Sequence, residues 1–377
     1  MKKKIVLALM AGMILAGTTT HAELNTDEIQ KLDAYYTLAS NYITKGDYEK
    51  AEEYVDACFT YCNEDTVSEE LLADLYLKKG CIDTINGETD SAVEALDQAI
   101  AYQADLSDAY LVKIQILLDQ MDYEAAVDNI QTYMELTGEQ EMDGTLAQIY
   151  ELMGDADKAS ETYETYIQST GVTETEAAFE NALYQMEIGL YDKAIENFAS
   201  CMENEDYSQA ASYNSLICML NKGSYDEAEA GFAEGLEAGW DYDGIYYNLA
   251  VCKMMKEDYE AAIENYKTSR EKESYQDEST RNIALCLMSQ GDADGALEEL
   301  TALIDAESPL ADEARTYRAS CYTDKEDYEN ALADMTACIE NGYNLSQSYY
   351  TRAQIYKAME EEDLYIADLE ASVKPEE

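Results

Sequence analysis

The sequence predicts an all-α fold made of similar helical hairpins packed one after another. Two observations carry this prediction. The 377 residues include only two prolines, Pro309 and Pro375, and 47% of the residues are apolar, enough for a sizeable core; an all-β fold would need more turn residues. A short pattern also recurs, as GDYEKAEEYV at 46–55 and EDYEAAIENY at 257–266, and self-similarity at a fixed spacing is the signature of repeat proteins.

The N-terminal residues 1–22 have the form of a secretory signal peptide. Three lysines precede an apolar run from Ile5 to Gly17, and Thr20 and Ala22 supply the small residues of a cleavage site. The run is shorter than the roughly 20 apolar residues that a membrane-spanning helix needs. We therefore expect an exported protein, secreted or held in the cell envelope, with an uncleaved membrane anchor as the alternative.

Each copy of the recurring pattern closes on an alanine, and the spacing between successive alanines is nearly constant. The longest gap includes TVSEELL at 66–72, which predicts an extended loop or a helix extension. The aligned positions are Ala51, Ala92, Ala126, Ala159, Ala194, Ala228, Ala262, Ala296, Ala331 and Ala367.

The residues around each aligned alanine predict two antiparallel helices in close contact. In most copies a small residue lies twelve positions earlier, as Ala39 does before Ala51, and a large apolar residue lies four positions later, as Val55 does. Positions i and i+4 share one helix face, and an acid at the start of the second helix suits the helix dipole. Three copies carry a large residue in place of the small one, and we expect looser packing there: Ile114, Leu216 and Ile355.

A helix–turn–helix unit with a period of about 34 residues resembles the tetratricopeptide repeat, and the resemblance covers residues 32–377. It implies a right-handed superhelical solenoid of about ten repeats, with no separate catalytic domain in 23–377. The expected repeats lie near 32–65, 73–106, 107–139, 140–173, 175–208, 209–242, 243–276, 277–310, 312–345 and 348–377.

Seven of the nine cysteines occupy two fixed positions of the repeat, where the family carries a small buried alanine. The resemblance therefore implies that they are core residues rather than disulfides: Cys58, Cys201, Cys218, Cys252, Cys286, Cys321 and Cys338. Cys62 and Cys81 fall outside this pattern, and a disulfide between them stays open. Cysteines that recur at the repeat period do not converge as a tetrahedral metal site requires, so no metal site and no cofactor is predicted.

The charge of the chain excludes several classes of partner. The net charge is −56, and loss of residues 1–22 would make it −59 because three lysines leave. Such a surface repels nucleic acids and anionic membranes and favours a basic partner or simple solubility. His21 is the only histidine, so the rest of the chain cannot form a histidine-based catalytic triad or metal site. We expect no enzymatic activity.

In the tetratricopeptide repeat family the first helix of each hairpin lines the concave face, through three inward positions at fixed spacings before the aligned alanine. The resemblance thus implies a groove across repeats five to eight in which eleven of the twelve inward side chains are apolar or aromatic. The same positions of repeat nine are all polar. The twelve groove residues are Phe179, Leu183, Met186, Tyr213, Ile217, Leu220, Tyr247, Val251, Met254, Arg281, Leu285 and Met288.

Two interpretations of these twelve groove residues stay open. They could be exposed and hold an amphipathic helix or an apolar peptide, or their side chains could pack on one another as core. Arg281 could hold a ligand carboxylate or form a salt bridge to a nearby Glu. The sequence therefore predicts an exported, non-enzymatic scaffold that binds a protein or peptide, basic or apolar-faced, in its concave groove. The alternative is a chaperone-like carrier of apolar segments of exported polypeptides, and the oligomeric state is left open.

Overall fold

The structure, a computed structural model, describes residues 24–62, 65–138 and 142–373. These residues form twenty α-helices and one short 3-10 helix, and no strand occurs among them. The prediction of an all-α helical solenoid is confirmed. The predicted signal peptide at 1–22 lies outside the described residues, and none of the helices within them is long and apolar enough to span a bilayer.

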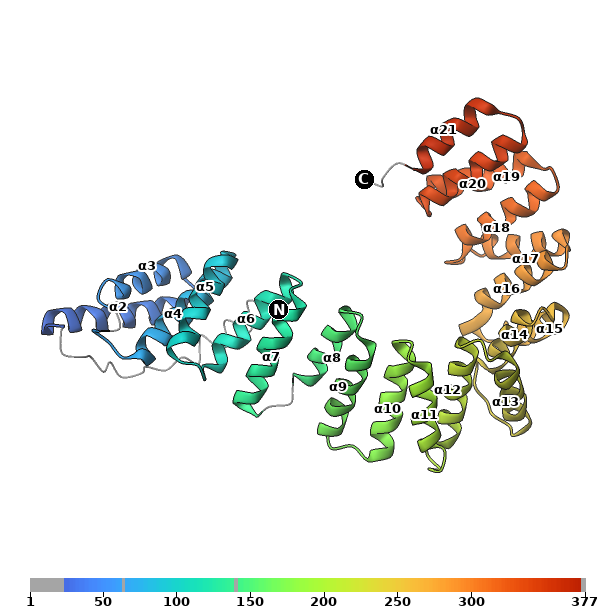
Figure 1. Cartoon of the computed structure of the whole chain (residues 1–377). Coiled ribbons are helices and arrows are strands. Elements are labelled where there is room, and N and C mark those ends of the chain that lie inside the picture. The colour runs from blue at the N-terminus through green and yellow to red at the C-terminus, as the bar shows by residue number, and fades with distance from the viewer. Residues whose placement is uncertain (1–23, 63–64, 139–141, 374–377) are drawn as a thin grey trace. The chain divides into compact units, whose positions relative to one another are not determined.

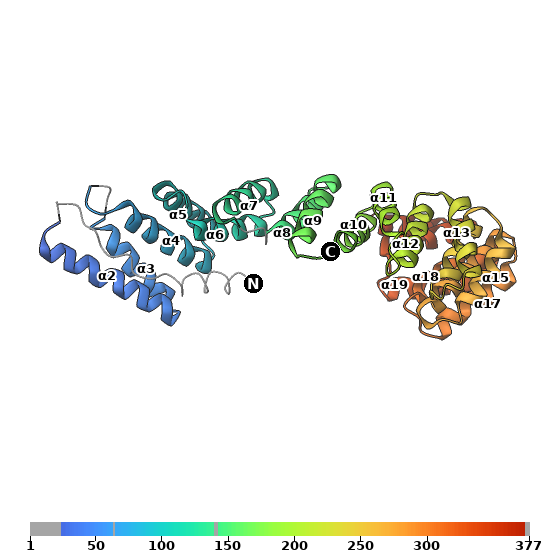
Figure 2. The same ribbon diagram turned by 90° about the horizontal axis from the view of Figure 1, so that it is seen from below.

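The chain divides into two compact halves, residues 1–177 and 178–377. In the N-terminal half each helix packs mainly on the helix before and the helix after it, and the hairpins follow in sequence order (Figures 1 and 2). Its helices are α2 (Thr26–Lys45), α3 (Tyr48–Phe59), α4 (Glu69–Asn86), α5 (Thr89–Tyr102), α6 (Ser107–Asp119), α7 (Tyr123–Thr137), α8 (Asp143–Leu152) and α9 (Ala156–Ser169).

The C-terminal half continues the same hairpin pattern from α10, whose first residues precede position 178. A single 3-10 turn, η1 (Glu273–Tyr275), leads into α16. The helices are α10 (Glu174–Glu187), α11 (Tyr191–Cys201), α12 (Ser208–Asn221), α13 (Tyr225–Glu237), α14 (Ile245–Met255), α15 (Tyr259–Ser269), α16 (Gln276–Ser289), α17 (Ala293–Asp305), α18 (Ala311–Asp324), α19 (Tyr328–Glu340), α20 (Leu345–Ala358) and α21 (Glu362–Ser372).

The turn inside each hairpin reads Gly-Asp-Tyr or Glu-Asp-Tyr in repeats one, seven and nine. Its first residue has a left-handed backbone, with φ of 73° at Gly46 and 63° at Glu257. In six repeats the aspartate that follows caps the second helix, as Asp258 does by accepting a hydrogen bond from the Ala261 N–H at 3.3 Å. The cap satisfies one of the unpaired N–H groups at the helix start, which explains why the pattern recurs at this point of the repeat.

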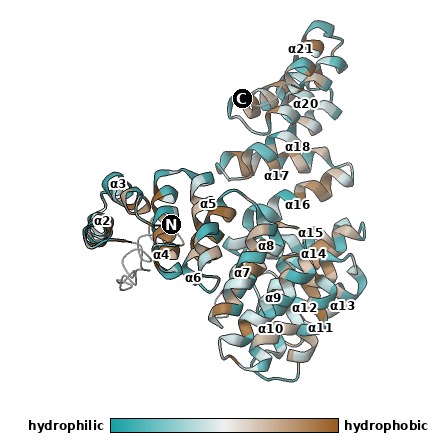
Figure 3. Cartoon of the chain, turned by 60° about the vertical axis from the view of Figure 1, so that its left-hand side comes forward, coloured by the Kyte–Doolittle hydropathy of each residue, from teal (hydrophilic) through white to brown (hydrophobic). Residues whose placement is uncertain are grey.

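The hairpins close around the aligned alanines. Nine of the ten are fully buried, from Ala51 to Ala331. Hydrophobic and hydrophilic residues alternate along the helices (Figure 3). In repeat six the large Leu216 is accommodated by Gly231, since a Cβ at that glycine would lie 2.2 Å from Leu216 Cδ2. A cavity of about 360 Å³ lies beside this contact, with Ser215, Gly235 and Trp240 in its lining.

The alignment of the last repeat on Ala367 is wrong, because Ala367 is exposed. The left-handed turn residue Glu360 follows Glu326, the turn residue of repeat nine, by one repeat period, so Tyr365 takes the place of the aligned alanine. The small residue of the first helix is then the buried Ala353 rather than Ile355, which is itself 2% exposed. The looser packing expected at Ile355 loses its basis.

All nine cysteines are free and buried, which confirms the prediction of core thiols. Cys62 packs in a cluster with Leu71 and Leu75, whereas Cys81 belongs to a neighbouring cluster around Ala92. Burial raises the pKa of these thiols, to about 12 for Cys81 and to about 11 for Cys252. They are therefore neutral at physiological pH.

Candidate protein-binding groove

The twelve predicted groove residues lie on four first helices of the C-terminal half, three each on α10, α12, α14 and α16. None is exposed. Tyr213 and Leu220 are buried, at 9% and 8% exposure, and the other ten are partly buried. The structure thus brings the row together on successive helices, but it covers the members to different degrees.

The first inward position of repeats five to seven carries an aromatic ring that packs between two other rings of its own repeat. Five of the six ring contacts are edge-on or tilted and one, between Tyr213 and Tyr242, is stacked, with ring centroids 4.1 to 5.8 Å apart. Aromatic pairs prefer such edge-on or offset arrangements. These rings belong to the hairpin core, as the second interpretation of the row supposes. The trios are Phe179 with Phe198 and Tyr207, Tyr213 with Phe232 and Tyr242, and Tyr247 with Tyr266 and Tyr275.

Hydrogen bonds from asparagines link two of these trios to the next repeat. Asn248 Nδ2 donates to Tyr213 Oη at 3.0 Å, and Asn282 Nδ2 donates to Tyr247 Oη at 3.1 Å. Burial raises the pKa of Tyr213 to about 12, so its hydroxyl stays neutral. The asparagines were not predicted as site residues, although their equivalent positions in two successive repeats were available as a signal in the sequence.

The second and third inward positions, apart from the buried Leu220, carry partly buried aliphatic and methionine side chains. Ile217, Val251 and Met254 pack on the cores of repeats six and seven but are only partly buried. Met254 Sδ also accepts a long hydrogen bond from Tyr266 Oη, at 3.8 Å. The row is completed by Leu183, Met186, Leu285 and Met288. We call these seven residues the apolar row from here on.

Arg281 interrupts the aromatic series at repeat eight, and its guanidinium is already engaged. Nη1 lies 3.4 Å from Glu313 Oε2 on α18, and Nε donates to Asn282 Oδ1 at 3.2 Å. The salt bridge to a nearby Glu, one of the two expected roles, is therefore the one in the structure.

The last two repeats replace the aromatic trios with charged contacts. Arg318 makes a two-bond contact to Asp334, at 2.8 and 2.7 Å, and donates to Thr301 at 3.0 Å. Arg352 makes the same arrangement one repeat later, at 2.7 and 2.9 Å to Asp368 and 3.1 Å to Thr336. These arginines lie on the first helices α18 and α20, and both carboxylates are buried.

Two family models of the tetratricopeptide repeat match the chain in four stretches. One matches residues 86–133 and 281–341, and the other matches 32–65 and 144–170. The chain is a tetratricopeptide repeat protein. This membership supports a protein–protein interaction scaffold, and the repeat fold is typically not catalytic.

Several solved structures are similar to this tetratricopeptide repeat protein. A chain of Naa15/Naa10 bound to HypK-THB is 16% identical with a TM-score of 0.49; the match covers 92% of this protein and 59% of that chain. A tetratricopeptide repeat protein from Parabacteroides merdae is 14% identical with a TM-score of 0.41, covering 81% and 100%. YrrB, a TPR protein with an unusual peptide-binding site, is 20% identical with a TM-score of 0.38, covering 48% and 92%. No curated protein matches the sequence.

Proposed function

We propose that this protein is an exported scaffold that binds a protein or peptide through the apolar row of α10, α12, α14 and α16. The observation that carries the proposal is the incomplete burial of these seven side chains, at the same repeat positions on four successive first helices. A continuous set of partly exposed apolar side chains is characteristic of interaction sites.

The composition of the row indicates the kind of partner. Methionine adapts to differently shaped surfaces, and an amphipathic helix or an extended apolar segment would match a row of this kind. The chain around it has a net charge of −56, so basic residues beside the apolar contacts of the partner would speed association and favour the correct partner.

Export rests on the sequence of residues 1–22, with its basic start and short apolar run. We expect the mature protein to begin at Glu23 and to be recovered outside the cytoplasm. Mass spectrometry of the protein from fractionated cells checks this, and an intact Met1 or Lys2 N-terminus in the recovered protein would contradict cleavage.

Paired substitutions test the binding site. The variant Ile217→Ala with Met254→Ala shortens two members of the apolar row, and the matched variant Ser320→Ala with Thr323→Ala changes the polar positions of repeat nine. We expect the first variant to lose at least tenfold in partner capture from its own cell envelope, while its helical circular dichroism is retained. The second variant should capture normally. Equal capture by both would place the partner elsewhere.

The methionines favour a second candidate, a chaperone-like carrier. Met186, Met254 and Met288 take the third inward position in three of the four repeats, and such adaptable surfaces suit partners of varied shape. A scaffold should capture one partner at fixed stoichiometry. A carrier should instead suppress the aggregation of unrelated unfolded polypeptides, and a light-scattering assay distinguishes the two.

A further inference from the structure

Three acidic side chains of the first two repeats converge in the N-terminal half. Glu52 lies on α3, Asp83 on α4, and Glu88 in the turn before α5. One carboxylate oxygen from each lies within 4.8 Å of the other two. Asp83 is fully buried, Glu52 is partly buried and Glu88 is exposed.

The buried Asp83 has an oxygen without a hydrogen bond. Its Oδ2 accepts from Ser91 Oγ at 2.6 Å, but Oδ1 is buried and has no hydrogen-bond partner. A buried carboxylate normally requires full compensation. The residues nine positions before the aligned alanine in the other repeats include no acid: Tyr42, Leu117, Tyr150, Gln185, Met219, Lys253, Leu287, Tyr322 and, in the corrected alignment, Tyr356.

Glu88 stands where six repeats carry a capping aspartate. Unlike Asp258 or Asp155, Glu88 makes no hydrogen bond to the start of the following helix. Its carboxylate belongs instead to the acidic cluster. Repeat two therefore lacks the aspartate cap that six repeats carry, as repeats five, six and ten also do.

Lys79 is the cation next to the cluster, and its ion pairs with the carboxylates are long. Its Nζ lies 3.5 Å from Asp83 Oδ1 and 3.7 Å from both Glu52 Oε1 and Asp56 Oδ1. One positive charge thus faces three carboxylates.

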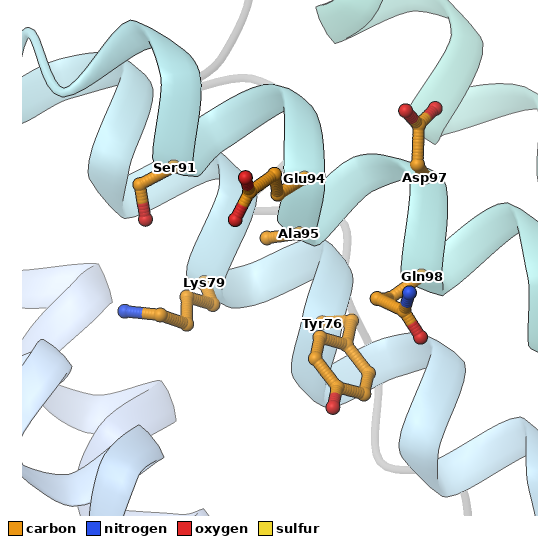
Figure 4. Close-up of a pocket in the computed structure, with 7 residues that line it drawn as sticks. All are labelled: Tyr76, Lys79, Ser91, Glu94, Ala95, Asp97 and Gln98. Atoms are coloured by element: carbon orange, nitrogen blue, oxygen red, sulfur yellow. The ribbon is translucent and has the colours of Figure 1, made fainter.

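An open cavity of about 380 Å³ gives solvent access to this part of the repeat. Lys79 and Ser91, the neighbours of Asp83, both line it. They lie at the same end of the cavity, away from Asp97 and Gln98 (Figure 4). A small ion can therefore reach the cluster once the Lys79 ammonium moves aside, and Asp56, with a side chain 59% exposed, offers that ammonium a place in solvent.

We propose that Glu52, Asp83 and Glu88 bind a calcium ion that displaces the Lys79 ammonium. Calcium takes six to eight oxygen ligands in a flexible geometry, whereas magnesium demands a near-ideal octahedron. One oxygen from each of the three carboxylates, together with water, satisfies the first requirement. The second oxygens of Asp83 and Glu52 accept hydrogen bonds from Ser91 and Asn86. Because the ligands come from two hairpins, the ion also ties repeat one to repeat two.

Calorimetric titration of the full chain with calcium chloride in 0.15 M potassium chloride tests the proposal. We expect one saturable site per chain above the diffuse binding of the acidic surface, together with a higher unfolding temperature. Asp83→Asn and Glu88→Gln should each weaken the site at least tenfold. Glu88 is exposed, so its variant keeps the test valid if Asp83→Asn fails to fold.

Two further variants make the result specific. Lys79→Met removes the competing ammonium and should tighten calcium binding several-fold, which a purely structural role for Lys79 would not produce. Asp143→Asn is the matched control, because Asp143 on α8 is also buried, at 5% exposure, and also has an oxygen without a hydrogen bond. Asp143→Asn should bind calcium as the parent does. Equal titrations for the parent, Asp83→Asn and Glu88→Gln, or weaker binding by Lys79→Met, would overturn the proposal.

Discussion

Repeats five to seven and repeats nine and ten share one backbone plan but are held together by different chemistry. In repeats five to seven, the aromatic trios and the Tyr–Asn bonds fill the contacts between helices. In repeats nine and ten, Arg318 and Arg352 take over with paired bonds to Asp334 and Asp368. The same helical hairpin is therefore held together by aromatic contacts in one region and by arginine–aspartate contacts in the other.

The two regions also differ in the side chains at their inward positions. The apolar row lies only on repeats five to eight, whereas the same positions of repeat nine are Thr316, Ser320 and Thr323. A polar inward face has little to offer an apolar segment. The comparison supports our proposal that partners bind the middle repeats, with the last two completing the stack.

The largest expected loss of stability comes from removing a ring of an aromatic trio. Phe232 is fully buried and packs edge-on against Tyr213, so Phe232→Ala should cost about 3–5 kcal/mol. Because contacts in repeat proteins are mainly between neighbours, amide hydrogen exchange should rise most in α12 to α14. An equal rise in α20 and α21 would mean that the two regions are not separable.

Loss of a charged contact in repeats nine and ten should lower the free energy of unfolding somewhat less. Arg318→Met leaves Asp334, 5% exposed, without its ionic partner, and breaking a buried pair in this way should cost about 3 kcal/mol. The double variant with Asp334→Leu should recover most of the loss in urea unfolding, because no buried charge remains. If the double variant is as unstable as the single one, the pair contributes more than mutual neutralisation.

A smaller effect is expected from alkaline pH. Burial raises the pKa of the Cys252 thiol from 9.0 to about 11, so between these values the unfolded chain loses a proton that the folded chain keeps. Stability is therefore full below pH 9 and falls as the pH rises towards 11. Thermal unfolding midpoints at pH 8 and 10.5 measure the fall, and Cys252→Ala should show a shallower one. A midpoint that does not depend on pH would contradict the burial of the thiols.

The smallest effect concerns the turns. Glu326 has a left-handed φ of 60° where six repeats carry glycine, and this conformation costs a side-chain-bearing residue about 1 kcal/mol. Glu326→Gly should therefore stabilise repeat nine by up to about 1 kcal/mol, measured by urea unfolding. Glu329→Gly, inside helix α19, is the matched control and should destabilise the protein. A loss of stability in both variants would show that the turn carries no backbone strain.

The sequence was sufficient for the features that the repeat period imposes. The buried alanines up to Ala331 follow from the spacing, and the burial of seven of the cysteines follows from the resemblance to the tetratricopeptide repeat. The last repeat was misaligned because Tyr365 fills the alanine position and Ala367 offers a match two positions later. The burial of Tyr213 depends on Tyr242, which lies beyond the intervening helix α13, and no local pattern reveals such a contact.

The acidic cluster was missed for a similar reason. Glu52 and Asp83 belong to different repeats of a chain whose Asp and Glu residues number 80 in total, so the pair does not stand out by composition. The usable signal was Asp83 itself, an acid at a repeat position that elsewhere carries none. Comparison of equivalent positions across repeats is therefore more informative here than local motifs.

Photo-crosslinking tests the central claim, that partners bind the middle repeats, most directly. One protein carries a photoreactive amino acid at position 217 of α12, and a matched protein carries it at position 320 of α18. The two positions are equivalent in the repeat, but the first has apolar neighbours and the second has polar ones. We expect one discrete crosslinked protein in the native cell envelope from position 217 and none from position 320. The same crosslinked protein from both positions, or one from position 320 alone, would contradict the assignment of binding to the apolar row.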